Sequence, residues 1–441
     1  MQAMDWPPAS KFTRPGGAEG DQGSLLQRNF RYQNETTMRQ RPVALKSLFP
    51  ILSGATTPAA VNRYPCSLAW RAAACFGLIA VAVASQLGAE PASLNQPAPP
   101  LVFPREKSEW PRVAPEAVGW NAEKLQATLA YAGQTRASGV VILHRGRILA
   151  EQYWSPDERA PAGKKAREYG AMVRGRDAAG HAIEDVASVQ KSVAAILVGM
   201  AQHRGLLRID DVVSQHLGRG WSKASPEQEA AITIRHLLTM TSGLTDDLTF
   251  EAPAGTRWRY NSAAYSRTVK VVAAVAKKSP DAVTREWLTG PLGMADSHWV
   301  ERAGAGREVA ANPLGFATTA RDLARLGLFV LGEGKWDGAT VFADRDYLQA
   351  ALHPSQSLNP SYGYLWWLNG QAEVARGAGG RVKGPLIPTA PPDLVAALGA
   401  IDRKLYVVPS LGIVVTRLGN SSGPAFQNEF WKLLMAAAPR R

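Results

Sequence analysis

A serine and a lysine three positions apart are the first pair in this sequence that could do chemistry. Ser188 and Lys191 stand in the run Val186–Ser192, and the apolar residues that follow them recur at helical spacing. Residues i and i+3 lie on one face of a helix, so both side chains are expected side by side on its first turn. A serine hydroxyl is a weak nucleophile until a base takes its proton. Burial and the positive end of a helix both disfavour a charged ammonium, so Lys191 could be that base.

The Ser-x-x-Lys pattern by itself is weak evidence, because it recurs by chance and most often marks an exposed polar pair on a helix. The helix that carries it here is otherwise apolar from Val193 to Ala201, and a lysine buried there needs a polar partner or a function. Two residues farther along could complete a site. Tyr260 could relay a proton between nucleophile, lysine and leaving group, although alone it is more typical of a core aromatic residue. Ser262 could hydrogen-bond the lysine or the substrate.

The sequence around this pair predicts the elements that must position it. A hairpin of two strands precedes it, and two more strands and a helix follow near the C-terminus. The Ser188 helix is expected to end near Gly205, which can cap it, and residues 210–330 have mostly helical patterns with turns. We therefore predict an α+β fold, an α/β/α sandwich. Its antiparallel sheet is built from N- and C-terminal segments and flanked by helices, with an inserted, mostly helical subdomain. The expected terminal elements are a helix with Leu125 and Leu129, strands 139–144, 147–154, 403–409 and 412–417, and a helix at 425–437.

Composition divides the chain into four expected segments. Residues 1–62 lack apolar periodicity and predict a disordered or unexpressed leader. Residues 63–89 resemble a signal peptide, with basic residues, an apolar stretch and a small-residue cleavage site after Ala89. Residues 90–115 are rich in proline and predict a linker. Residues 116–441 predict the folded domain.

The apolar stretch at residues 72–87 is short for a membrane span, which needs about 20 residues. We therefore expect an exported protein, periplasmic or secreted, that is attached to the membrane only if this signal-like segment is retained. Both cysteines, Cys66 and Cys75, lie in the signal-like segment. Their position excludes disulfides, cysteine nucleophiles and cysteine-based zinc sites from the expected mature protein.

The net charge of +13 suggests nucleic-acid binding, but its distribution opposes that interpretation. Residues 1–72 carry nine Lys and Arg against four Asp and Glu, so +5 of the net charge belongs to the leader and the basic start of the signal-like segment. The other basic residues are scattered and form no cluster typical of nucleic-acid binding. The seven histidines show no pair four residues apart that would suit zinc, and we expect no cofactor and no metal.

Five segments carry recognisable motifs: Ser188–Lys191, Ile234–Leu244, Pro253–Ser262, Thr319–Arg325 and Tyr362–Trp367. They resemble the serine β-lactamase and penicillin-binding-protein superfamily, over about residues 115–437. Within it the chain is similar to the class C-like branch with the 6-aminohexanoate-dimer hydrolases and related esterases. The resemblance implies that Ser188 is the acylated nucleophile, Lys191 its base and Tyr260 the proton relay. The tyrosine motif is Tyr-Asn-Ser here, where β-lactamases have Tyr-x-Asn.

The family's third motif, Lys-Thr-Gly or His-x-Gly, lies on a strand that lines the site. Its counterpart is the run Ala-Ala-Leu-Gly-Ala before the first C-terminal strand, in which Ala397 stands where the family has a basic residue. A substrate carboxylate would lose its charged partner there. The resemblance still implies an oxyanion hole from the backbone N–H groups of Ser188 and Ala400, with Gly399 and Ser262 beside the substrate.

These features predict an exported serine hydrolase whose partner is a small-molecule ester or short amide of low charge; they leave the oligomeric state open. Two alternatives remain. One is a β-lactamase or D-alanyl-peptide carboxypeptidase, and the other is a penicillin-binding-like binding module with a weak or inactive site. Arg376 and Lys383 could replace the missing charge, although their Gly-rich surroundings favour a solvated loop. The chain has no Gly-x-Ser-x-Gly elbow, which disfavours an α/β-hydrolase.

Overall fold

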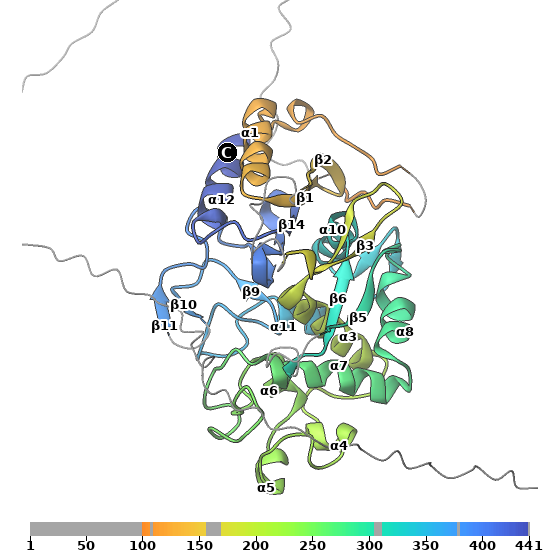
Figure 1. Ribbon diagram of the computed structural model, residues 1–441, viewed down its shortest axis with the longest axis vertical. Coiled ribbons are helices and arrows are strands. Elements are labelled where there is room, and N and C mark those ends of the chain that lie inside the picture. Colours follow the sequence, from red (N-terminus) through yellow and green to blue (C-terminus); the bar gives the residue numbers. More distant parts are fainter. Residues whose placement is uncertain (1–98, 106–108, 156–168, 304–310, 377–379, 440–441) are drawn as a thin grey trace, which may run out of the picture. The chain divides into compact units, whose positions relative to one another are not determined.

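The computed structural model describes residues 99–105, 109–155, 169–303, 311–376 and 380–439 (Figure 1). The expected leader and the signal-like segment lie outside these residues and stay predictions. The described chain belongs to one compact unit, Pro91–Arg441. None of its described helices combines the length and the apolar character that a membrane crossing requires.

A six-stranded antiparallel sheet forms the centre of the fold, and segments from both ends of the chain build it. Its strand order is β2-β1-β14-β13-β12-β9, so the C-terminal strand β14 pairs directly with the N-terminal strand β1. This order confirms the predicted sheet. The strands are β1 (Ala137–His144), β2 (Arg147–Tyr153), β9 (Trp367–Leu368), β12 (Val395–Leu398), β13 (Lys404–Val408) and β14 (Ile413–Gly419).

Four helices cover the sheet: α1 (Ala122–Gln134), α3 (Gln190–His203), α10 (Ala320–Leu331) and α12 (Phe426–Ala437). Successive side chains of a strand point to opposite faces. In β1, Val140 and Ile142 join the core with α1 and α12, whereas Val141 and Leu143 join the core with α3 and α10. Because both faces are buried, β1 is apolar at consecutive positions. Figure 1 shows α1 and α12 together, away from α3, and the predicted α/β/α sandwich is confirmed.

The middle of the chain is mostly helical, as predicted, but it contributes to a second antiparallel sheet with strand order β3-β4-β6-β5. These strands are short, and several of their residues are exposed or half-buried, so they lack a strong apolar pattern. The strands are β3 (Val173–Arg176), β4 (Ala182–Asp185), β5 (His298–Glu301) and β6 (Leu314–Thr318). The helices are α4 (Val213–Leu217), α5 (Pro226–Glu229), α6 (Ile234–Leu238), α7 (Ser262–Ala276), α8 (Pro280–Thr284) and α11 (Arg345–Ala351).

Short elements complete the described fold. The expected solvated loop around Arg376 and Lys383 is instead a pair of antiparallel strands in its described part; both of these side chains are exposed, whereas Val374 on the first strand is buried. The hairpins are β7 (Lys335–Trp336) with β8 (Ala339–Thr340) and β10 (Glu373–Arg376) with β11 (Gly380–Lys383). A π-helical turn spans Arg285–Thr289, and 3-10 turns span Glu116–Val118, Ala187–Val189, Ala400–Asp402 and Pro409–Leu411.

The expected linker at residues 90–115 packs against the domain over its described part. Trp110 is only 3% exposed and donates from Nε1 to the carbonyl oxygen of Gly146 at 2.8 Å. Val113 donates its backbone N–H to Ile148 in β2 at 3.0 Å. Proline favours extended backbone, and here that backbone lies along the β1–β2 hairpin rather than spacing two bodies apart.

Candidate active site

Ser188 lies in the tight turn that joins β4 to α3. The 3-10 turn that contains it ends before the first α-helical residue, Gln190, so Ser188 lies just outside α3 rather than in its first turn. Ala187 has a φ of 49°, in the left-handed region that costs a residue with a Cβ roughly 1–2 kcal/mol. Ser188 is partly exposed, whereas Val189 behind it is buried. The serine hydroxyl therefore lies on a strained turn that is anchored by the buried side chain of Val189.

Lys191 is almost fully enclosed, with 2% of its surface exposed. Its Nζ donates to Ser188 Oγ at 2.9 Å and to Ser262 Oγ at 3.2 Å. The same nitrogen lies over the rings of Tyr260 and Tyr265, 4.7 and 4.2 Å from their centroids. The structure therefore brings together four residues singled out from the sequence, and it adds Tyr265 to them.

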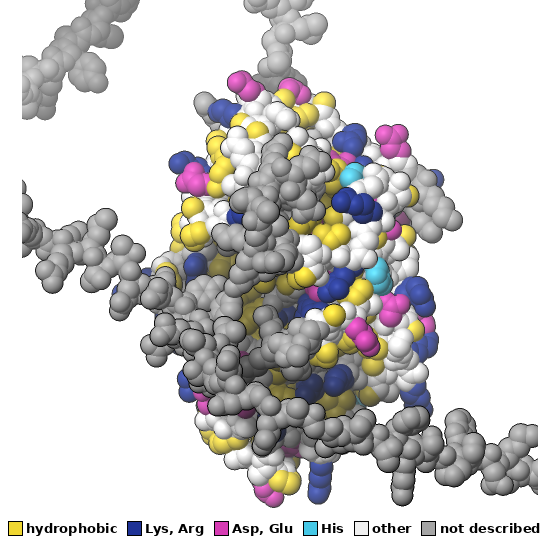
Figure 2. All heavy atoms as spheres, viewed as in Figure 1, with side chains coloured by type: hydrophobic (Ala, Val, Ile, Leu, Met, Phe, Trp, Pro, Cys, Tyr) yellow, Lys and Arg dark blue, Asp and Glu magenta, His cyan; other side chains and the backbone are white. Residues whose placement is uncertain are grey.

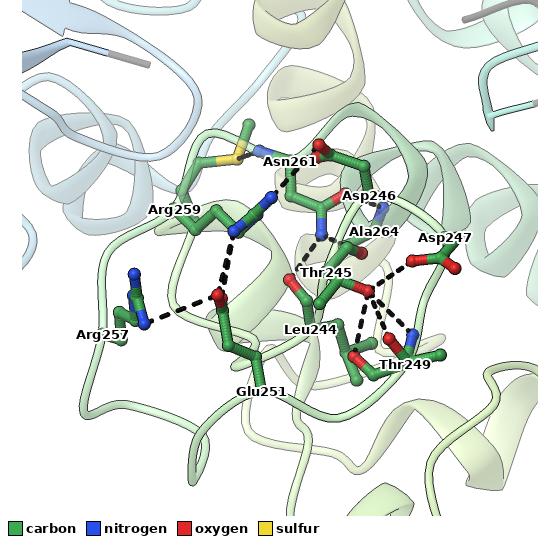
Figure 3. A network of polar contacts seen from close by, with 11 residues as sticks. Leu244, Thr245, Asp246, Asp247, Thr249, Glu251, Arg257, Arg259, Asn261 and Ala264 are labelled. Atoms are coloured by element: carbon green, nitrogen blue, oxygen red, sulfur yellow. Dashed lines mark hydrogen bonds and ion pairs between the residues drawn. The ribbon is translucent and has the colours of Figure 1, made fainter. Parts of the chain in front are cut away.

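Asn261 holds the start of α7, which presents Ser262 to the lysine. Its Oδ1 accepts a hydrogen bond from the backbone N–H of Ala264 at 2.9 Å, as an N-cap residue does. Its Nδ2 donates to the carbonyl oxygens of Leu244 and Thr245, both at 2.8 Å (Figure 3). The asparagine of the Tyr-Asn-Ser motif therefore ties the Thr-Ser-Gly-Leu turn to α7 and is itself 1% exposed.

The basic residues that flank this motif are paired with carboxylates. Arg259 contacts Glu251 at 3.0 Å and Asp246 at 3.2 Å, and Arg257 contacts Glu251 at 3.4 Å (Figure 3). Their positive charge is balanced within the loop before α7. It therefore does not supply a dedicated anion contact in place of the missing basic residue of the third motif.

Tyr260 is both a packed aromatic residue and a neighbour of Lys191. Its ring stacks on Trp367 with centroids 5.9 Å apart and planes 24° apart. Tyr362 and Trp258 lie edge-on or tilted to it, each with a centroid distance of 6.4 Å. Aromatic contacts of this kind restrict a ring to one orientation, so packing holds Tyr260 beside the lysine.

The end of β12 lies against the turn that contains Ser188. A Cβ added to Gly399 would lie 2.4 Å from the carbonyl oxygen of Val186, so only glycine permits this approach. Ala400 follows it, is exposed, and begins a 3-10 turn. Ala397 is 1% exposed and pairs with Leu405 in β13. The apolar methyl group of Ala397 is therefore packed into the core on the α3 side of the sheet.

A family model described as Beta-lactamase matches residues 122–439. The chain belongs to the β-lactamase family. An uncharacterized protein of Alkalihalophilus pseudofirmus is 25% identical over 308 residues, which cover 65% of this chain and 84% of that protein. This family consists of serine hydrolases of the β-lactamase and penicillin-binding-protein type, as the sequence motifs predicted.

Solved structures agree on the fold. A protein of Bacillus anthracis proposed to be a 6-aminohexanoate-dimer hydrolase is 14% identical with a TM-score of 0.53, covering 76% of this chain and 88% of that one. A penicillin-binding-protein homologue of Caulobacter crescentus is 15% identical with a TM-score of 0.51, covering 73% and 99%. A class C β-lactamase is 17% identical with a TM-score of 0.51, covering 72% and 95%. At such identities the likeness establishes the β-lactamase fold alone.

Tyr265 is the neighbour of Lys191 that sequence reasoning missed. It follows Ser262 by three residues on α7, so it shares that face of the helix, and this spacing is the signal that could have revealed it. Burial raises the pKa of the Tyr265 phenol to about 12, which keeps it neutral near pH 7. Its hydroxyl is bonded to Gln190 and Asn312, so its ring, not its hydroxyl, faces the lysine.

Proposed function

We propose that this member of the β-lactamase family is an exported serine hydrolase that forms an acyl-enzyme on Ser188 and cleaves carboxylic esters or short amides. One observation carries the proposal. The Lys191 amine, nearly excluded from water, lies 2.9 Å from the hydroxyl of a partly exposed serine. That distance is within reach of direct proton transfer between a nucleophile and its base.

The proposed reaction assigns the chemical steps to Ser188, Lys191 and Tyr260. Ser188 Oγ attacks the substrate carbonyl carbon while its proton passes to the neutral amine of Lys191. The developing oxyanion accepts hydrogen bonds from the backbone N–H groups of Ser188 and Ala400; losing one such donor typically costs about 100- to 1000-fold in rate. Tyr260 and Lys191 return the proton to the leaving alcohol or amine. Water then attacks the acyl carbon by the same route and releases the acid.

The proposed preference for substrates of low charge rests on the end of β12. A buried methyl group at Ala397 replaces the family's basic side chain, and Arg257 and Arg259 are already paired with carboxylates. A substrate carboxylate would therefore be desolvated without a charged partner, which is unfavourable. Uncharged acyl groups beside Tyr260 and Trp367 lose less hydration free energy on binding.

The decisive experiment measures hydrolysis and probe labelling by the purified full-length protein. We expect turnover of p-nitrophenyl butyrate, at least 10-fold lower kcat/KM for an acyl chain ending in a carboxylate, and labelling by a fluorophosphonate. Ser188→Ala should abolish both activities. Ser192→Ala is the matched control, because this buried serine on α3, four residues after Ser188, donates to the carbonyl oxygen of Leu365 at 2.8 Å instead. Tyr260→Phe should slow turnover by about 100-fold, in the range of general acid–base catalysis.

Three results would contradict parts of this proposal. Unchanged labelling of Ser188→Ala would remove the nucleophile assignment. Nitrocefin turnover faster than ester turnover, or a stable penicillin adduct, would favour the β-lactamase or D-alanyl-peptide carboxypeptidase alternative. A folded protein that neither hydrolyses any of these compounds nor reacts with the probe would favour the binding module.

Export is a separate part of the proposal and rests on residues 63–89. If the segment is a signal peptide, the protein recovered outside the cytoplasm should begin after Ala89. N-terminal sequencing of the exported protein tests this, and recovery of an uncut chain in the membrane fraction would instead support anchoring through residues 72–87.

A further inference from the structure

The strained turn before Ser188 is held by a buried carboxylate. Asp185, the last residue of β4, has no exposed surface, and its Oδ1 accepts the backbone N–H of Ala187 at 2.9 Å. Ala187 is the residue with the left-handed φ of 49°. Backbone strain of this kind persists only where surrounding contacts impose it. The Asp185 carboxylate is such a contact, and it acts on the residue that directly precedes the nucleophile.

Arg302 makes the short contacts to that carboxylate and reaches past the nucleophile, while Arg174 Nη2 lies farther away, 3.8 Å from Asp185 Oδ2. Arg302, just after β5, donates from Nε and Nη2 to the two oxygens of Asp185, at 2.7 and 2.8 Å. Nη2 also donates to Gln190 Oε1 at 2.9 Å. The guanidinium therefore contacts a residue before Ser188 and a residue after it. A bidentate arginine contact restricts geometry more than a lysine ammonium can.

Strand β6 completes the enclosure. Gln190, which has no exposed surface, accepts the backbone N–H of Phe316 at 3.0 Å and donates to the carbonyl oxygen of Leu314 at 2.8 Å. Between them, a Cβ added to Gly315 would lie 2.2 Å from Asp185 Oδ2. Because Gly315 has no side chain, the Asp185 carboxylate fits against β6, so β6 of the second sheet accommodates this ion pair.

We propose that Asp185 and Arg302 are positioning residues for the nucleophile, and that they act by holding Ala187 in its left-handed conformation so that the Ser188 hydroxyl stays beside Lys191. This inference rests on the proposed function. Neither residue contacts substrate. The ion pair sets the fraction of molecules in which serine and lysine are aligned, and small misalignments of reacting groups lower turnover steeply.

Asp185→Asn tests the inference in two backgrounds, the parent and Ala187→Gly. The amide keeps an oxygen for the Ala187 N–H but loses the charge that fixes it. In the parent background we expect kcat for p-nitrophenyl butyrate to fall by about 10- to 100-fold, with KM changed less than 3-fold. Glycine adopts positive φ without strain, so in the Ala187→Gly background the same substitution should cost less than 3-fold in kcat. A role confined to general stability would give equal losses in both backgrounds.

Two further variants keep the test decisive. Arg302→Lys preserves the charge but not the bidentate contact, and it should repeat the background-dependent loss even if Asp185→Asn does not fold. Glu151→Gln is the matched control, because Glu151 is a 3% exposed carboxylate with a bidentate contact to Arg321 at 2.5 and 2.8 Å, on β2 at the far edge of the main sheet from β12. It should leave kcat within 3-fold.

The outcomes separate the two proposals. An inactive parent overturns the proposed hydrolase function. An active parent in which Asp185→Asn or Arg302→Lys loses nothing, or loses equally in both backgrounds, overturns the positioning role while leaving the hydrolase function intact.

Discussion

Two lysines are buried among the residues that the structure describes, and their surroundings differ in kind. Lys191 is 2% exposed and contacts two serine hydroxyls and the faces of two tyrosine rings. Lys404 is 5% exposed and is ion-paired to Asp402, with Nζ 3.2 Å from Oδ1. Lys404 alternates with Leu405 in β13, so it points to the sheet face opposite α3, the face of Tyr406.

The difference teaches what a buried amine needs in order to act as a base. A carboxylate stabilises only the charged ammonium, whereas a hydroxyl accepts a hydrogen bond from an ammonium and donates one to a neutral amine. Lys191 therefore has neighbours that suit both protonation states, although the ring faces favour the charged one. Burial lowers the pKa of Lys404, while the Asp402 carboxylate opposes that shift. The first environment suits proton transfer, and the second suits a structural ion pair.

The largest expected effect comes from Lys191→Met. Removal of the base should lower kcat for ester hydrolysis by about 1000-fold or more, equivalent to about 4 kcal/mol on the barrier. The free energy of unfolding should stay constant or rise, because an apolar side chain replaces a buried amine. Steady-state kinetics and urea unfolding measure the two quantities on the same preparation. Retained turnover would show that the two lysines do not differ in function.

Lys404→Met should show the converse pattern. It leaves the largely buried Asp402 carboxylate without its ion-pair partner, although the Ser422 N–H at 2.7 Å remains. We expect the free energy of unfolding to fall by about 1–3 kcal/mol, with kcat within about 3-fold of the parent. Urea unfolding at pH 7 tests the first expectation. A large loss of kcat in a stably folded variant would contradict the structural assignment of this lysine.

A buried carboxyl group, Asp322, extends the comparison, and its substitution should have the smallest effect per pH unit. Asp322 is 5% exposed and accepts hydrogen bonds from the Ser297 hydroxyl and the Asp296 N–H, both at 2.9 Å. Burial raises its pKa to about 7, from 3.8. The folded protein then binds more protons than the unfolded chain between these values. This contribution to stability is complete below pH 3.8 and is lost as pH rises through 7.

Asp322→Asn should remove that dependence. The slope of unfolding free energy against pH between 4 and 7 should become less negative, by at most about 1.4 kcal/mol per pH unit. Urea unfolding of parent and variant across this range measures the slope. Equal slopes in the two proteins would show that burial does not raise the pKa of Asp322 in the folded protein.

Much of the fold and part of the site followed from local patterns. The spacing of Ser188 and Lys191, the apolar run in β1 and the paired strands near the C-terminus are properties of short stretches, which periodicity captures. The second sheet escaped prediction because its strands are short and partly exposed. The packing of Trp110 against the domain also escaped prediction, because proline content reports backbone preference, not what the backbone packs against.

By itself, the sequence determined the order of the elements that build the main sheet, the family and the pair of residues that could form a nucleophile and its base. Only the tertiary structure decided which groups enclose that pair. Tyr265, Asp185 and Arg302 come from α7, β4 and the end of β5, and no local pattern links them. The physical reason is that spacing along a chain reports which residues share one face of one element. The protonation and orientation of a buried amine depend instead on contacts between elements far apart in the sequence.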